Sequence, residues 1–133
     1  MPELTGLYYV GLTVRDVHAS TAWYMRVLGM TKVLERLKAD GVHKEALLSH
    51  LSSGMLIGLI SHEANNGRPF SEFRTGLDHL ELGVADRDEL EAWLAHLDAH
   101  GVAHSEIKEL SSSLIVTLRD PDNIQLELYV LKC

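Results

Sequence analysis

Residues 76–86 read Gly76-Leu77-Asp78-His79-Leu80-Glu81-Leu82-Gly83-Val84-Ala85-Asp86, and this stretch decides the fold. Apolar and polar residues alternate in it, which is the period of a half-buried β-strand. The apolar face, expected to pack against a helix, carries Leu80, Leu82 and Val84. The opposite face carries His79, Glu81 and Gly83. That face is too polar for a core, so we expect it to line a cavity.

The same design occurs seventy residues earlier, as Tyr9-Val10-Gly11-Leu12-Thr13-Val14-Arg15-Asp16. A shift of seventy aligns Leu12 with Leu82 and Asp16 with Asp86. It also aligns the two tryptophans, at positions 23 and 93. The chain is therefore predicted to be one module used twice, with Tyr9 as the counterpart of His79.

Size and charge narrow the possible classes of protein. The chain has 133 residues, enough for one substantial core and too few for two independent ones. A formal net charge of -7 gives no basic patch for nucleic acid. The single cysteine, Cys133, rules out an intrachain disulfide and a cysteine-based metal site. Neither a signal-peptide pattern nor a long apolar run is present, so we expect a cytoplasmic protein with no membrane contact.

Turn and capping signals divide the chain into a module at 1–61, a linker at 62–75 and a module at 76–133. In the first module we expect a strand at 7–14, a helix from the N-cap Asp16 to Gly29, and strands at 31–38, 42–51 and 55–61. Asp40-Gly41 is a strong hairpin signal. In the second module we expect a helix from Asp86 to Gly101 and strands at 102–109, 113–119 and 124–131. The helix carries an apolar stripe, expected to be buried, at Leu90, Trp93, Leu94 and Leu97.

The alternation of side chains along the strand at 124–131 brings a second set of polar residues to the face of His79. That face is expected to carry Gln125, Glu127 and Tyr129. A shift of sixty-nine aligns Gly58 with Glu127. The duplication thus predicts a pseudo-twofold site with four corners: His79 and Glu127 from one module, Tyr9 and Gly58 from the other. Only His79 and Glu127 are good metal ligands.

These residues carry a resemblance to a known family. The motifs are Val10 to Asp16, Trp23-Tyr24, Leu28-Gly29, Gly76 to His79, Asp120-Pro121-Asp122-Asn123 and Glu127. Together they resemble the vicinal oxygen chelate superfamily, which includes glyoxalase I, bleomycin resistance proteins and extradiol dioxygenases. The resemblance implies an α+β fold in which paired βαβββ modules form a curved mixed sheet around a cavity, usually in a homodimer.

The resemblance also implies a divalent metal ion at the corners of the cavity. His79 and Glu127 match ligand positions, whereas Tyr9 stands where a histidine is common and Gly58 where glyoxalase I has a carboxylate. Tyr9 could ligate only as a phenolate, and its ordinary pKa of about 10 would have to fall considerably. The candidate ligands are therefore His79, Glu127 and Tyr9. The expected substrate pocket comprises Tyr9, Thr13, Gly58, Ile60, His62, Glu81 and Tyr129.

Each candidate also has a structural interpretation. His79 can be a hydrogen-bonded cavity histidine without a metal, and Tyr9 and Tyr129 can be pocket walls. We interpret Glu81 as a solvated edge residue rather than a base that contacts substrate. Five other histidines lack ligand spacing and are interpreted as surface residues: His43, His50, His96, His100 and His104.

Two classes of function stay open. In the first, a metal-dependent lyase or dioxygenase uses its ion to polarise vicinal oxygens of a small substrate or to bind dioxygen. Its ion could be iron, manganese, nickel, zinc or magnesium, since a mixed nitrogen and oxygen site does not separate them. In the second, a protein of the bleomycin resistance type sequesters a small molecule without chemistry and without a metal. His79 and Glu127 favour the first class, and Tyr9 and Gly58 favour the second.

Overall fold

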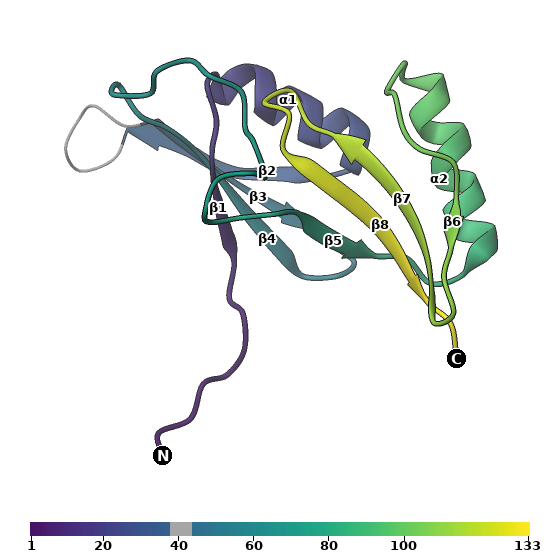
Figure 1. The fold of residues 1–133 in the computed structure, drawn as a ribbon. Coiled ribbons are helices and arrows are strands. Elements are labelled where there is room, and N and C mark those ends of the chain that lie inside the picture. The colour runs from purple at the N-terminus through teal and green to yellow at the C-terminus, as the bar shows by residue number, and fades with distance from the viewer. Residues whose placement is uncertain (38–43) are drawn as a thin grey trace. The chain divides into compact units, whose positions relative to one another are not determined.

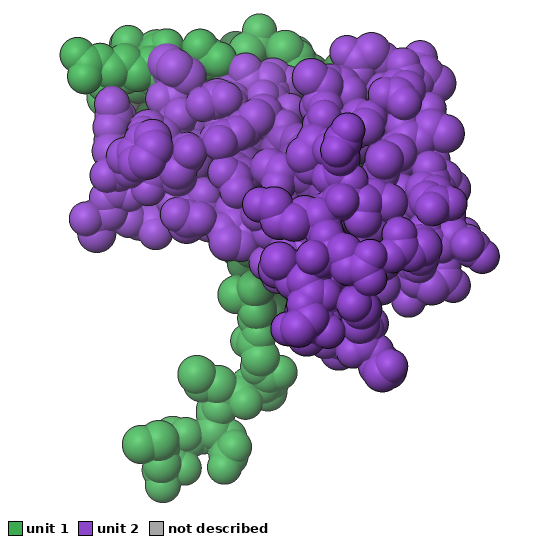
Figure 2. Space-filling model, turned by 45° about the vertical axis from the view of Figure 1, so that its right-hand side comes forward, with its two compact units in different colours: residues 1–68 green, residues 69–133 purple. Residues whose placement is uncertain are grey.

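The computed structural model of the chain describes residues 1–37 and 44–133 (Figure 1). They form two compact units, Met1–Arg68 and Pro69–Cys133 (Figure 2). The boundary between the units falls inside the segment that the sequence predicts as a linker. The predicted Asp40-Gly41 hairpin lies outside the described residues. Within those residues, no helix is both long and apolar enough to span a membrane.

The first unit is a four-stranded mixed sheet with one helix. Its elements are β1 (Val10–Thr13), α1 (Val17–Leu28), β2 (Thr31–Leu37), β3 (Lys44–His50) and β4 (Met55–Ser61), and the strand order is β1-β4-β3-β2. Asp16 caps α1 by accepting a hydrogen bond from the Ala19 amide at 3.0 Å. Gly29 ends it with φ of 70°, in the left-handed region that glycine adopts without strain. Helix and sheet bury Tyr24, Leu48 and Leu59 completely.

The second unit repeats this arrangement. Its elements are β5 (Leu80–Gly83), α2 (Arg87–Ala99), β6 (Lys108–Glu109), β7 (Ser113–Arg119) and β8 (Gln125–Leu131), in the order β5-β8-β7-β6. Asp86 caps α2 by accepting from the Glu89 amide at 2.9 Å. In the turn before β8, Asp120 accepts from the amides of Asp122 and Ile124, each at 2.8 Å. Both units are βαβββ modules, which confirms the predicted α+β fold.

Some of the predicted strands are too long, including the strand within residues 76–86, of which only Leu80–Gly83 is regular. The first begins at Val10 instead of Leu7, because no described residue of β4 pairs with the chain before Val10. The strand predicted at 102–109 shrinks to Lys108–Glu109 and one isolated bridge from His104 to Leu118. Between these pairings the Ser105 hydroxyl accepts a hydrogen bond from the Thr117 amide at 2.9 Å. A side chain thus takes a backbone donor that a regular ladder would use.

The apolar stripe of α2 is only partly buried. Leu90 and Leu97 are fully buried, as predicted, but Trp93 and Leu94 are half-buried. The Trp93 ring meets His96 of the same helix edge-on, with centroids 5.3 Å apart. The indole therefore lies partly along the helix surface rather than entirely in the core.

Candidate metal centre

Two carboxylates face each other across adjacent strands of the second unit. In β8 the residues that turn toward the core, Leu126, Leu128 and Val130, are buried, and Glu127 lies on the other face. The parallel pairing of β5 with β8 places Glu81 directly in register with Glu127. Like charges in register on neighbouring strands repel each other. A cation between the two carboxylates would relieve this repulsion.

His79 supplies a nitrogen beside both carboxylates. Its Nε2 lies 3.2 Å from Glu81 Oε1 and 3.5 Å from Glu127 Oε2. Its Nδ1 lies 2.7 Å from Asp78 Oδ1. A carboxylate on one ring nitrogen fixes the orientation of the ring and the tautomer, so Asp78 holds Nε2 toward Glu81 and Glu127.

Electrostatics at this ring favour a positive charge. The hydrogen bond to Asp78 raises the pKa of His79 most, and Glu81 and Glu127 raise it further. A proton on Nε2 then partly neutralises the two carboxylates. A divalent ion in the same place would do so more completely.

The three side chains fit a metal ion by geometry and by donor type. One donor atom from each of His79, Glu81 and Glu127 lies within 4.8 Å of the others. Metal bonds to such ligands are about 2.0–2.2 Å long, so donors on one ion lie up to about 4.4 Å apart. Small side-chain adjustments therefore bring all three onto one ion. One nitrogen and two carboxylate oxygens suit several first-row divalent metals.

Glu81 is more than the solvated edge residue that we inferred from the sequence. Its side chain is 42% exposed, but its carboxylate contacts the imidazole of His79. The alternation in β5 had placed Glu81 on the face of His79. What the sequence did not provide was the register of β5 against β8, which sets Glu81 opposite Glu127.

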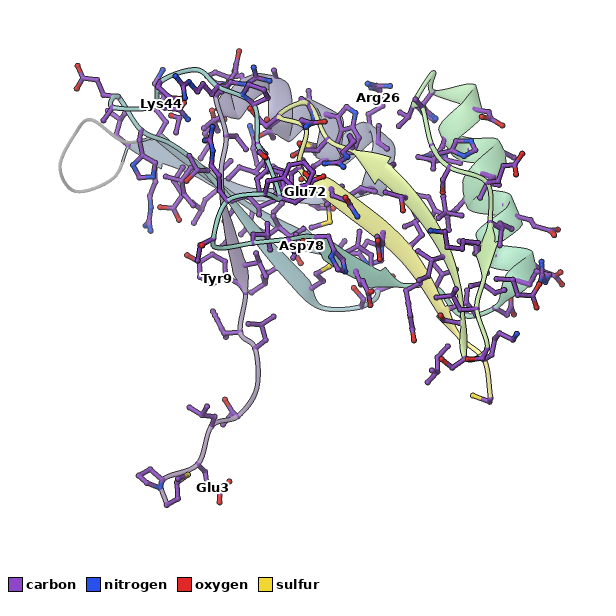
Figure 3. All side chains as sticks on the ribbon, viewed as in Figure 1. Glu3, Tyr9, Arg26, Lys44, Glu72 and Asp78 are labelled. Carbon is purple, nitrogen blue, oxygen red and sulfur yellow. The ribbon has the colours of Figure 1, made fainter. Side chains whose placement is uncertain are left out.

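The corresponding positions of the first unit are filled differently. There Gly11 and Gly58 lie in register, as Glu81 and Glu127 do in the second unit. The ring of Tyr9, labelled beside β1 in Figure 3, covers this glycine pair. A Cβ on Gly58 would lie 2.8 Å from Tyr9 Cε2, and one on Gly11 would lie 3.7 Å from the Tyr9 hydroxyl. The Tyr9 ring thus occupies the space that a side chain at position 58 would need, whereas at position 11 the tight neighbour is Ile60 Cδ1, 3.3 Å from the Cβ position.

The other predicted pocket residues divide between the units. Thr13 and Ile60 are in register with each other, two residues beyond the glycine pair. Thr13 is exposed and Ile60 is buried, whereas His62 follows the end of β4 and is exposed. Tyr129 is half-buried on the face of Glu127. The structure thus brings His79, Glu81 and Glu127 together in one unit, and the four-corner arrangement stays a prediction.

A series of hydrogen-bonded side chains leads away from Glu127, and it was not predicted from the sequence. Gln125 Nε2 donates to Glu127 Oε1 at 3.1 Å, and the Arg119 guanidinium donates to Gln125 Oε1 at 2.9 Å. The same guanidinium donates to both carboxylate oxygens of Glu72, each at 3.1 Å. Glu72 belongs to the segment predicted as a linker, and 47 residues separate it from Arg119. No local pattern signals a contact over that distance.

Comparison with known proteins places the chain in a family. A sequence model of the Glyoxalase/Bleomycin resistance protein/Dioxygenase superfamily matches residues 6–128. The chain belongs to this superfamily. The finding confirms the resemblance stated above and accounts for the paired βαβββ modules. Fold membership by itself leaves the activity open, since one fold serves many reactions.

Three known proteins similar to this chain are informative. A glyoxylase/bleomycin resistance protein/dioxygenase domain from Frankia sp. EAN1pec is 31% identical, with a TM-score of 0.89 over 98% of this chain and 100% of that one. Catechol-2,3-dioxygenase of Bacillus subtilis (strain 168) is 30% identical over 96% of this chain, which spans only 42% of that protein's length. A variant of the fosfomycin resistance protein FosX from Listeria monocytogenes shares the fold. It has 18% identity and a TM-score of 0.71 over 96% of this chain and 93% of that one, and its structure is that of a complex with Mn(II) and 1S,2S-dihydroxypropylphosphonic acid.

Proposed function

We propose that this superfamily member binds one divalent metal ion through His79, Glu81 and Glu127. In this proposal it acts on a small molecule with neighbouring oxygen atoms, as a metal-dependent lyase or dioxygenase. The observation that carries the proposal is the register of Glu81 with Glu127, with the Nε2 atom of His79 beside both. Such a pair of carboxylates is costly without a cation, because like charges repel and the Glu127 side chain is only 13% exposed.

The roles of the side chains follow from their surroundings. An ion bound here would act as a Lewis acid toward substrate oxygens or would bind dioxygen. His79 would supply the nitrogen donor in an orientation that Asp78 fixes. Glu81 and Glu127 would supply anionic oxygens and offset the charge of the ion. The exposure of Glu81 leaves this side of the cluster open to a small molecule.

Calorimetric titration with Mn²⁺ tests the proposal. The variants are His79→Ala and Glu81→Gln, and the control is Glu91→Gln, an exposed carboxylate on α2 outside the cluster. We expect one ion per chain for the wild type and the control. Affinity should be lower by about 10-fold or more in both cluster variants, because His79→Ala removes one of three ligands and Glu81→Gln replaces an anionic donor with a neutral one. Mn²⁺ suits this test because it prefers oxygen ligands and binds weakly to isolated histidines elsewhere on the chain.

The reaction requires a separate measurement. Oxygen uptake with catechol by the Fe²⁺-loaded protein tests the dioxygenase class that the Bacillus relative represents. The reaction should be lost in Glu127→Gln. Absence of Mn²⁺ binding by the wild type would contradict the proposal itself, whereas metal binding without oxygen uptake would contradict only the dioxygenase class.

One observation favours a second candidate, a binding protein without chemistry. The Tyr9 ring on Gly11 and Gly58 leaves the first unit without carboxylates at the positions that match Glu81 and Glu127. An aromatic surface of this kind suits the capture of flat or apolar molecules. Such a protein would bind no metal and would keep its affinity for its small molecule in Glu127→Gln.

A further inference from the structure

We infer that Arg119 is a positioning residue that sets the orientation of Glu127 through Gln125, and that Glu72 holds Arg119 in place for this role. The inference rests on the proposed metal site. It assigns a function to residues that lie outside the ligand set, one of them in the segment that precedes β5. In Figure 3, Glu72 and Asp78 are both labelled on that segment.

The orientation of the Gln125 side-chain amide decides which of its groups meets Glu127. An amide has one acceptor end and one donor end, and the hydrogen-bond partners decide which way it points. A guanidinium can only donate, so Arg119, 2.9 Å from Gln125 Oε1, holds the amide oxygen on its own side. The NH₂ group must then point to Glu127, where it donates to Oε1 at 3.1 Å. Oε2 of Glu127 remains on the side of His79.

Arg119 is itself restrained from two directions. Both terminal nitrogens donate to the Glu72 carboxylate, and one of them also donates to the Asn123 carbonyl at 3.1 Å. Two parallel hydrogen bonds to a carboxylate fix the plane of a guanidinium. The segment that carries Glu72 is anchored in turn, because the Phe70 amide donates to the Asp122 carbonyl at 2.7 Å. The turn before β8 therefore holds both Arg119 and the segment of Glu72.

Charge and positioning predict opposite effects when Arg119 is replaced. If Arg119 acted only through its charge, its removal would strengthen metal binding, because one repelling cation disappears and Glu72 becomes an uncompensated anion. If Arg119 positions Glu127, its removal weakens metal binding, because Gln125 can rotate and Glu127 loses its fixed orientation. Outer partners of metal ligands typically change affinity by about 10- to 100-fold.

The test uses the full chain with Mn²⁺ as the probe. Arg119→Met removes the hydrogen-bond donors while the side chain keeps a similar length. Gln125→Met removes the side-chain hydrogen bonds that link Arg119 to Glu127 without a change in net charge. Arg119→Lys keeps the charge and one donor group. The matched control is Arg87→Met, which removes an arginine from an ion pair with Glu109 in the same unit, 2.9 Å long and away from the cluster. Calorimetry gives the affinity, and thermal unfolding of the metal-free proteins gives the stability.

We expect Arg119→Met and Gln125→Met to bind Mn²⁺ about 10-fold more weakly than the wild type, with Arg119→Lys intermediate and Arg87→Met unchanged. In the metal-free protein, the NMR signals of the Gln125 side-chain amide should shift in Arg119→Met toward those of a solvent-exposed amide, and should not shift in Arg87→Met. Unchanged or tighter Mn²⁺ binding in Arg119→Met would overturn the inference, as would a lower melting temperature without a change in affinity. A wild type that binds no Mn²⁺ would instead overturn the proposed function, and this inference with it.

Discussion

A glycine in the middle of a strand lowers stability, because it has no side chain to pack and loses much backbone entropy on folding. Gly58 of β4 and Gly11 of β1 nevertheless lie opposite each other in the first unit. The Tyr9 ring accounts for Gly58, since it lies where a side chain at that position would be, and the same ring is in van der Waals distance of a Cβ at Gly11. At the scale of single residues, these three positions thus form one packing unit.

This packing predicts a coupling between Tyr9 and Gly58. Gly58→Ala should destabilise the wild type by about 1–3 kcal/mol, because a Cβ there would lie 2.8 Å from the ring. In a Tyr9→Ala background the same substitution should cost little or stabilise, since the space is then free. A double-mutant cycle from denaturant unfolding measures the coupling.

Gly83→Ala in β5 is the matched control for this cycle. A Cβ on Gly83 would meet no atom within 4 Å, so the substitution should be close to neutral. Equal losses for Gly58→Ala in the two backgrounds would show that the Tyr9 ring does not determine the glycine at position 58.

At the scale of elements, the different burial of the apolar residues of α2 predicts unequal losses of unfolding free energy when each is replaced by alanine. Leu97 is fully buried and Trp93 is half-buried. Leu97→Ala should therefore cost about 2–5 kcal/mol, and Trp93→Ala less than the 3–5 kcal/mol typical of a fully packed aromatic residue. Urea unfolding of the two variants gives the comparison. A larger loss for Trp93→Ala than for Leu97→Ala would contradict the observed orientation of the helix.

The end of α2 also predicts a dependence of stability on pH. His104 is not the surface residue expected from the sequence, since its side chain is only 13% exposed. Its Nδ1 lies 2.7 Å from the Ser105 carbonyl and its Nε2 lies 2.7 Å from Asp98 on α2. Both partners are acceptors, so the protonated ring suits this site. The Ser105 carbonyl first, and then Asp98, raise the pKa of His104 above its ordinary value of 6.5.

The sign of the effect follows from linkage. The stabilisation is fully present below the ordinary pKa of 6.5 and is lost as the pH rises through the higher pKa of the folded state. The difference in unfolding free energy between wild type and His104→Gln should therefore shrink as the pH rises. Taking this difference removes the contribution of His79, whose pKa is raised as well. A difference that grows with pH would contradict the assigned hydrogen bonds.

The sequence predicted the helices and most strands well, because the side-chain periodicity and capping residues that specify them involve residues close together in the chain. Asp16 and Asp86 cap the two helices as expected, since a cap depends on residues three positions away. The sequence predicted only part of the cluster of His79, Glu81 and Glu127. His79 and Glu127 followed from alternation and from the resemblance, but Glu81 required the register of two strands that are far apart in the chain. The contact between Glu72 and Arg119 depends on a path of the chain that no periodicity encodes.

At the scale of the whole molecule we expect a homodimer. Large apolar side chains of the N-terminal segment are exposed at Met1, Leu4, Leu7 and Tyr8. β1 and β5 also each stand at the end of a sheet, and open sheet edges favour association. Sedimentation equilibrium at micromolar concentration should give twice the chain mass of 14.8 kDa. A monomer under those conditions would contradict this expectation.

The three candidate ligands all come from one copy of the repeat, and this has an evolutionary consequence. A duplicated gene that keeps its ligands in one half frees the other half from selection on the ion. Substitutions around Tyr9 can then drift or diversify while His79, Glu81 and Glu127 stay intact. A lineage built in this way can change the molecules that it recognises faster than it changes its chemistry.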